Sequence, residues 1–226
     1  MLRRISGLIG ATAFALMANA ATAHPHIFIN TGLELQFDDA GMLAAVRIVW
    51  GYDSFYSLST LTDLGLDPDA DEVLTAAELA RLQGFDMQWM AGFEGDTYLQ
   101  QGTRMVKLGG PLSPDAKVIG GHIVTTHLRR VLPAAAPVDP ADGPLVIRVY
   151  DPTYCTAYEI TLPVLFIGRQ DCDAKLVLPD ETAANAALAA ALSALGPTQT
   201  LEDAGVDVAA AVGGAFAPQV TVTCSG

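Results

Sequence analysis

An alternation of apolar and polar residues near the start of the chain constrains its fold more than any other feature. Residues 27–37 read IFINTGLELQF, in which most alternate side chains are apolar, as in a strand with one buried face. The turn-forming letters DDAG follow at residues 38–41, and residues 42–52, MLAAVRIVWGY, return as a second strand. The pattern predicts a long antiparallel β-hairpin.

Helical periodicity follows the hairpin and returns near the other end of the chain. Leu, Met and aromatic residues recur every three or four positions in residues 54–64 and 75–90, and Thr75 with Glu78 fits a capping box. A third, alanine-rich helix is expected over residues 179–194, with Asp180 as its N-cap.

The rest of the chain predicts further strands. They are expected within residues 96–110, 122–131, 144–152 and 158–167, and a short strand carries Cys224 at the end. Residues 133–143 are rich in alanine and proline, but they are only as long as a generous loop. We therefore predict one α+β domain over residues 24–226, with antiparallel β-sandwich-like sheets and a helical insertion, at about residues 53–92, that carries an EF-hand-like loop.

The first 23 residues differ in kind from the rest. Arg3 and Arg4 precede an apolar run at residues 8–17, and Ala21-Thr22-Ala23 has the small-residue pattern of a cleavage site. The apolar run is short for a membrane span. We expect a signal peptide cleaved after Ala23 and a periplasmic mature chain that begins at His24, is soluble and does not span a membrane.

The charge of the chain limits its partners. Lys and Arg number 12 against 25 for Asp and Glu, which gives a formal net charge of -13. Nucleic acid is therefore excluded as a partner, because phosphate binding needs a basic face. Cations are the natural ligands of such a surface, although an acidic balance also serves solubility alone.

Export changes how the three cysteines are interpreted, because disulfides persist in oxidising compartments. Cys172 and Cys224 both lie in strand-like contexts in the last quarter of the chain, so we pair them. Cys155 stands among aromatic and β-branched neighbours, which favours a buried small hydrophobic residue over a reactive or metal-binding thiol.

The most specific local motif is DPDADEVLTAAE at residues 67–78, which lies between the first two expected helices. A calcium-binding EF-hand loop needs side-chain oxygens at positions 1, 3, 5, 9 and 12 and a carbonyl at position 7. These positions hold Asp67, Asp69, Asp71, Thr75 and Glu78, with Val73 for the carbonyl.

One position departs from the EF-hand pattern. The loop turns at position 6 with positive φ, where glycine is expected and this chain has Glu72, at a cost on the order of 1 kcal/mol. The alternative to a calcium site is an acidic loop that caps the following helix and binds no ion.

Histidine is scarce in this chain, with four residues in all. His24 and His26 are the first and third residues of the expected mature chain and point to one side if the chain is extended. The amine and imidazole of His24 can chelate one ion as a histidine brace. Such nitrogen-rich ligands suit zinc, copper, nickel or cobalt. The alternative is a frayed, solvated terminus.

Further ligands are needed to complete such a site. His122 and His127 are five residues apart on one expected strand and face opposite sides, so at most one joins the terminal pair, and we favour His127. Asp53 is a candidate carboxylate neighbour. The pair Arg129-Arg130 is interpreted as a solvated strand end.

The order of these features resembles a known family. The chain opens with HPHIFI and ELQFDDAG, continues through WGYD at residues 50–53 and the acidic loop, and later contains THL and VYDP. It resembles the periplasmic family called domain of unknown function 1007, whose members are described as components of ABC-type transport systems and are associated with nickel, cobalt or zinc transporters. His24, His26, Asp53, His127 and the acidic loop fit the family pattern, whereas Glu72 and Cys155 depart from it.

Three functions remain as hypotheses. The first is a non-catalytic periplasmic accessory protein that captures a transition metal ion and delivers it to a membrane metal transporter, with calcium in the acidic loop. The second is a structural or adaptor module of a transport system that calcium stabilises. The third is a copper oxidase that uses the histidine brace. Other enzymes are disfavoured, because the chain lacks a nucleophile elbow, a phosphate-binding glycine loop and an HExxH helix.

Overall fold

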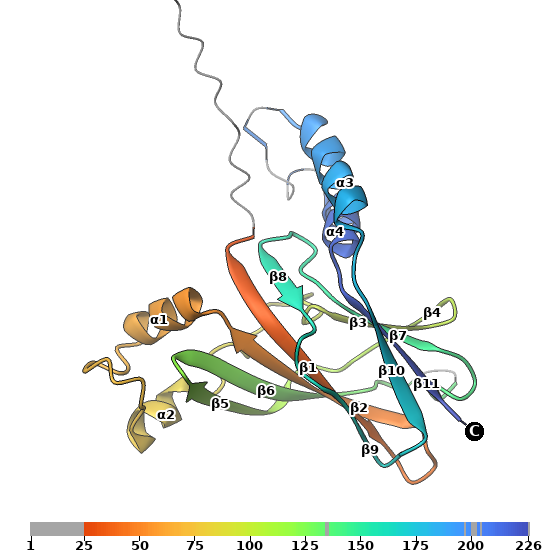
Figure 1. The fold of residues 1–226 in the computed structure, drawn as a ribbon, viewed down its shortest axis with the longest axis horizontal. Helices are drawn as coiled ribbons and strands as arrows, with labels where there is room; N and C mark the ends of the chain where they lie inside the picture. The colour runs from red at the N-terminus through yellow and green to blue at the C-terminus, as the bar shows by residue number, and fades with distance from the viewer. Residues whose placement is uncertain (1–24, 134–135, 197, 200–202, 204, 226) are drawn as a thin grey trace, which may run out of the picture.

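The computed structural model describes residues 25–133, 136–196, 198–199, 203 and 205–225. It is a mixed α+β fold with two sheets and few helices (Figure 1). The expected signal peptide, residues 1–23, lies outside the described residues. In the part of the chain that is described, no helix is long and apolar enough to cross a membrane.

The first sheet is built around the N-terminal hairpin that the alternating pattern predicts. Its strands are β1 (Ile27–Phe37), β2 (Leu43–Tyr52), β5 (Leu112–Ile119), β6 (His122–Arg130), β8 (Thr156–Glu159) and β9 (Val164–Ile167). The order is β5-β6-β2-β1-β8, with β9 also beside β1. β8 and β9 both run parallel to β1, and the other pairs are antiparallel. The strand expected within residues 158–167 is divided into β8 and β9, and the break contains Pro163, which has no backbone N–H to donate to a neighbouring strand.

The second sheet is antiparallel throughout. Its strands are β3 (Thr97–Gln101), β4 (Arg104–Val106), β7 (Leu145–Val149), β10 (Cys172–Val177) and β11 (Gln219–Cys224), in the order β10-β11-β7-β3-β4. Cys172 and Cys224 are direct register partners on β10 and β11, and they form the expected disulfide. Cys155 is a free cysteine and is half-buried.

The two sheets share one hydrophobic core. Alternate residues of β1 and β2, such as Leu33 and Ile48, are fully buried, and so are Leu99, Ile147 and Val222 of the second sheet. Burial of these side chains is the main stabilising contribution to a fold of this kind. The expected α+β class is confirmed, and the two sheets are mostly antiparallel, with β8 and β9 as the parallel exceptions.

In the described part of the chain, four helices lie outside the sheets: α1 (Ser54–Asp63), α2 (Ala76–Leu82), α3 (Glu181–Ser193) and α4 (Val206–Ala215). α1 contacts β6 and α2 contacts β5, whereas α3 and α4 lie side by side at another part of the molecule (Figure 1). The caps expected at Thr75 and Asp180 are present. α4 was not predicted, because its alanine and glycine residues have weak helical periodicity.

The second helix is shorter than residues 75–90 predict. It ends at Leu82, because the side chain of Gln83 bonds to both the N–H and the C=O of Ala116 on β5, and its backbone leaves the helical region. Gly84 follows with φ of 68°. Tertiary contacts thus override a local helical pattern.

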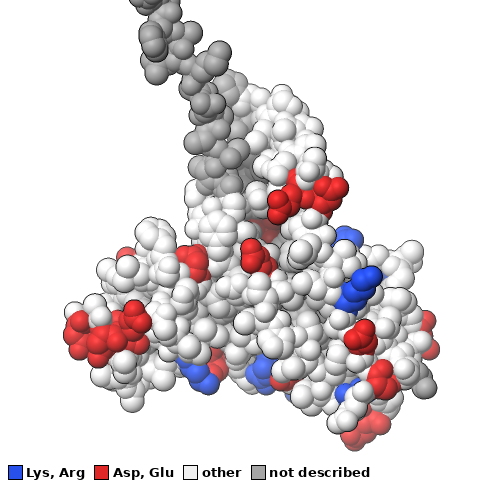
Figure 2. All heavy atoms as spheres, viewed as in Figure 1, with Lys and Arg blue, Asp and Glu red and all other residues white. Residues whose placement is uncertain are grey.

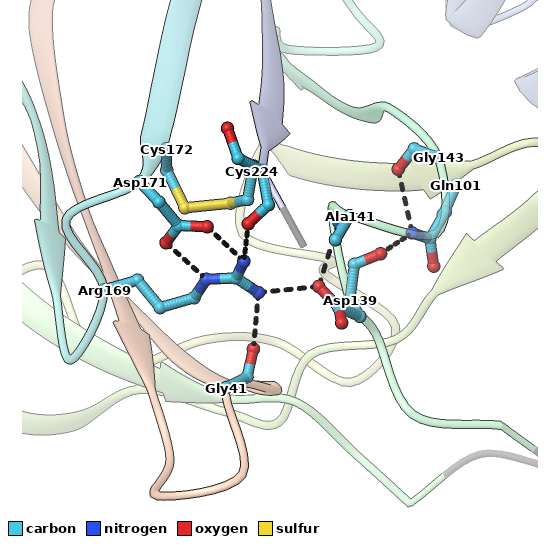
Figure 3. Close-up of a disulfide and its surroundings, with 10 residues drawn as sticks. Gly41, Gln101, Asp139, Ala141, Gly143, Arg169, Asp171, Cys172 and Cys224 are labelled. Carbon is cyan, nitrogen blue, oxygen red and sulfur yellow. Dashed lines mark hydrogen bonds and ion pairs between the residues drawn. A yellow bond between two sulfur atoms is a disulfide. The ribbon is translucent and has the colours of Figure 1, made fainter.

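The described part of the loop at residues 133–143, which leaves out 134–135, packs onto the body of the protein. Val138 is buried, and the guanidinium of Arg169 donates to Asp139 Oδ1, to Asp171 and to the carbonyl of Gly41 (Figure 3). This arginine lies beside the disulfide and joins the β1–β2 turn, the loop and the segment before β10. The described part of the loop therefore belongs to the same fold.

Candidate metal sites

The histidines expected at the mature N-terminus are only partly described. His24 lies outside the described residues. His26 is exposed and immediately precedes β1, and its backbone N–H donates to the carbonyl oxygen of Cys155 at 2.8 Å. The parallel register of β1 and β8 places Cys155 next to His26, which the sequence spacing did not indicate.

Asp53 lies at the same end of the sheet as His26. Its backbone N–H donates to the carbonyl of Phe28, two residues after His26. Its Oδ2 accepts from the N–H of Phe28 and its Oδ1 accepts from the N–H of Tyr56, both at 2.9 Å. The carboxylate thus caps α1 and fastens it to β1, which is a structural role in this fold.

His127 lies in the core. Its side chain is fully buried, and neither ring nitrogen has a hydrogen-bond partner among the described residues. Its ring is in edge contact with Trp50, at 4.7 Å between centroids, and with Trp89, at 5.5 Å. Burial, with a smaller effect of Arg129 and Arg47, lowers the pKa of His127 to about 3, so the imidazole is neutral.

The structure does not bring His127 to His26, the one described histidine of the N-terminal pair. His127 pairs with Ile48, and Ile48 pairs with Leu33 of β1. Leu33 is seven residues after His26, a separation of about 23 Å along a strand. The expectation that His127 completes a shell with His26 is therefore not met, because alternation along β6 points this side chain into the core.

Arg129 is also buried, which corrects its interpretation as a solvated strand end. It is 2% exposed, and its guanidinium donates to the backbone carbonyls of Gly109, Glu94 and Leu108. It also lies over the ring of Trp89, 5.1 Å from the ring centroid. His127 and Arg129 share the core face of β6 because they are two residues apart.

A buried carboxyl completes this polar region, and no pattern in the sequence indicated it. Asp96 is 5% exposed, and its Oδ2 accepts from the hydroxyl of Tyr158 at 2.7 Å. Burial raises the pKa of Asp96 to about 7, and the charge of Asp151 adds to this effect. Its Oδ1 has no hydrogen-bond partner among the described residues.

The acidic loop between α1 and α2 brings three carboxylates together. Ligand oxygens of Asp67, Asp69 and Asp71 lie within 4.8 Å of one another. Among the described residues this is the one group of three or more His, Cys, Asp or Glu side chains that meets that spacing. Acidic side chains gather visibly at this end of the molecule (Figure 2). The arrangement can supply hard oxygen ligands to a divalent cation.

The remaining loop residues expected to bind calcium lie close to this cluster. Glu78 accepts from the N–H and hydroxyl of Thr75, and hydrogen bonds from Thr75 and from the backbone of Asp67 lower its pKa. Position 12 of the loop thus approaches position 1. Glu72 has φ of 64°, the left-handed conformation that the spacing predicts for position 6. Val73 is exposed.

The chain matches the sequence model of a known family. A family model described as "Protein of unknown function (DUF1007)" matches residues 9–224. No curated protein matches the chain. The matched segment includes both sheets, the acidic loop and all three cysteines. The chain therefore belongs to the DUF1007 family.

Proposed function

We propose that this protein is a periplasmic metal-binding accessory protein that captures a transition metal ion through His24 and His26 and delivers it to a membrane metal transporter. The ion is zinc, nickel, cobalt or copper. It is cargo, and the protein performs no chemistry on it.

The exposure of His26 at the start of β1 carries this proposal. Its backbone is fixed by the hydrogen bond to Cys155, while its side chain remains at the surface. Cleavage after Ala23 would leave the amine and imidazole of His24 two residues before this fixed point. Two imidazoles and an amine suit borderline divalent ions, and a site without a closed shell of thiolates suits release.

The corrected position of His127 changes the ligand set. With His127 in the core, the ion is held by His24 and His26 and by ligands from water or from the receiving protein. A shell left open in this way favours transfer over storage, because the partner can add its own ligand before the first protein releases the ion.

Calorimetry with zinc, nickel, cobalt and copper on protein with its native N-terminus tests the proposal. Mass spectrometry first verifies that the chain begins at His24. Replacing both His24 and His26 with alanine is expected to weaken binding at least tenfold without changing the melting temperature of the metal-free protein. One extra residue before His24 should weaken binding as well, because it displaces the amine from its chelating position.

His122 supplies the matched control. It lies on β6, which β2 separates from β1, and its Nδ1 is 2.8 Å from the carbonyl oxygen of Tyr52. His122→Ala is expected to leave the affinity unchanged. Equal affinity of the parent and the His24→Ala/His26→Ala protein would overturn the proposal.

The acidic loop favours a second candidate function, a structural or adaptor module of a transport system in which an EF-hand-like loop binds calcium. The cluster of Asp67, Asp69 and Asp71 supports it. Calcium should then raise the melting temperature, whereas zinc, nickel and copper should not. Asp69→Asn should abolish the calcium effect, and Asp63→Asn, at the end of α1, should preserve it. A calcium effect retained in Asp69→Asn would contradict this candidate.

A further inference from the structure

A cleft of about 700 Å³ separates the α3–α4 pair from the strands beneath it. One wall comes from α3 and α4, and the other comes from β8 and the segment between β7 and β8. In the space-filling view a hollow lies between the helical pair and the sheets (Figure 2). Its volume is in the range of pockets that hold small organic molecules.

Aromatic rings from different parts of the chain line this cleft. Tyr154 stacks on Phe216, with ring centroids 4.2 Å apart, and Tyr150 stacks on Tyr98 at 4.4 Å. Leu176 and Leu178 add apolar surface, and Leu178 is 71% exposed. These side chains form a surface that can bury an apolar body.

A close contact of α4 holds the helical wall of the cleft near the strands. A Cβ atom on Gly213 would lie 2.2 Å from the carbonyl oxygen of Asp151, so the helix can approach the β7–β8 segment only because this residue is glycine. The cleft is therefore built by a specific close contact and is not a gap left between loosely associated elements.

The charge of the cleft has one sign. Asp151, Glu159 and Glu181 line it, and none of the described residues that line it is Lys, Arg or His. The carboxylate of Asp151 accepts from the backbone N–H groups of Thr153, Cys155 and Thr156, which holds it in place. Burial raises the pKa of the Tyr154 hydroxyl, and the negative charge of Glu181 raises it further. The carboxylate of Glu181 therefore influences the aromatic side of the cleft.

We propose that this cleft binds a small organic cation that has an aromatic or alkyl body. One face of each ring in the stacked pair Tyr154 and Phe216 is covered by the other ring, so the pair offers its remaining faces and edges to the body and the cation. Glu159 and Glu181 neutralise the charge of the cation. An anion of the same shape would be repelled. The cleft adjoins His26, whose backbone N–H donates to the carbonyl of Cys155 between the lining residues Tyr154 and Thr156. Its binding chemistry uses neither His26 nor the acidic loop, so the inference does not depend on the proposed metal function.

Three probes of matched shape test this inference by calorimetry. They are 4-phenylbutylamine, which is cationic, 4-phenylbutan-1-ol, which is neutral, and 4-phenylbutyrate, which is anionic. The amine is expected to bind with one site per chain and at least tenfold more tightly than the alcohol, and the acid is expected not to bind. Equal binding of amine and alcohol, or no binding of the amine, would overturn the proposal.

Variants of the cleft locate the binding site. Glu159→Gln with Glu181→Gln should weaken amine binding at least tenfold, and Phe216→Leu, which keeps an apolar side chain without a ring, should weaken it severalfold. The control pair Asp63→Asn with Glu94→Gln removes two charges elsewhere and should leave binding unchanged. If the control pair weakens binding as much as the cleft pair does, attraction to the whole acidic surface accounts for the binding and the proposal fails.

A structural effect of these variants can be separated from a loss of ligand contacts. Circular dichroism and the melting temperature of each variant show whether the fold is kept. Addition of 50 mM and 200 mM sodium chloride then tests the role of charge, because amine binding in the parent should weaken with salt while that in the Glu159→Gln/Glu181→Gln protein should change little.

Discussion

The edge of the Trp50 indole meets the imidazole of His127 in the core, with ring centroids 4.7 Å apart and ring planes at 66°. The indole N–H of Trp50 and both nitrogens of His127 have no hydrogen-bond partner among the described residues. Burying such groups without partners costs free energy. His127 therefore places polar atoms in the core that an apolar side chain of similar volume would not.

Replacement of His127 distinguishes the packing of the ring from its polarity. His127→Leu is expected to raise the free energy of unfolding by about 1 kcal/mol, because it removes two unsatisfied nitrogens and keeps most of the volume. His127→Ala should lower it by about 2–4 kcal/mol through the cavity that it leaves. Urea unfolding measures both. A loss in the leucine variant as large as that in the alanine variant would contradict this expectation.

The dependence of stability on pH should show two opposing contributions from the core. In the unfolded chain the imidazole of His127 takes up a proton below pH 6.5, whereas in the folded protein it does so only near its pKa of about 3. The contribution of His127 to stability therefore falls as the pH falls from 6.5 to 3. Burial raises the pKa of Asp96 from 3.8 to about 7, so its contribution falls as the pH rises between these values.

Single variants separate these two contributions. Asp96→Asn should leave the His127 effect, so stability should rise between pH 4 and pH 6.5 relative to the parent. His127→Leu should leave the Asp96 effect, so stability should fall over the same range. Each slope is at most about 1.4 kcal/mol per pH unit. Urea midpoints at half-unit intervals test this, and parallel curves for the two variants would show that neither group titrates as its burial implies.

Two adjacent glycines in α4 should respond differently to alanine. A Cβ at Gly213 would collide with the backbone of Asp151, whereas one at Gly214 would meet the ring of Tyr150 at an ordinary distance of 3.7 Å. Gly213→Ala is expected to destabilise the protein by about 1–3 kcal/mol. Gly214→Ala should be neutral or stabilise by up to about 1 kcal/mol through its helix propensity. Thermal unfolding of both variants makes the comparison, and equal losses would show that this close contact is absent.

The strained position in the acidic loop can be relieved. Glu72→Gly should raise the free energy of unfolding by about 1 kcal/mol, because glycine adopts the left-handed conformation without a steric penalty. Glu72→Ala removes the same charge but keeps the strain, so it is the matched control and should not be stabilised. Calcium affinity should increase more in the glycine variant if the loop binds this ion. Equal stability of the two variants would argue against strain at this position.

The sequence predicted the strands better than the site, for a physical reason. Alternation in residues 27–37 and the turn at 38–41 specify a hairpin locally. The end of α2 depends instead on the contact between Gln83 and Ala116, which are far apart in the sequence. The parallel pairing of β8 and β9 with β1 likewise leaves no local signal.

The candidate site shows the same limit. His127 was expected to bind metal because histidine is scarce, but alternation along β6 gives it the same face as Ile123, Thr125 and Arg129, all of which are buried. This alternation can be read from the sequence and could have predicted that His127 lies in the core. The proximity of Cys155 to His26 could not have been inferred, because it follows from the tertiary pairing of β1 with β8.

The pairing of β1 with β8 and β9 also has a consequence for the order in which the protein can assemble. β1 follows the first described residues directly, but the strands that cover its outer edge begin at Thr156 and Val164. During synthesis the N-terminal hairpin must wait for more than a hundred residues before this edge is closed. Until then this edge of β1 presents unpaired backbone N–H and C=O groups, and the large sequence separation of the pairs that close it makes their formation slow.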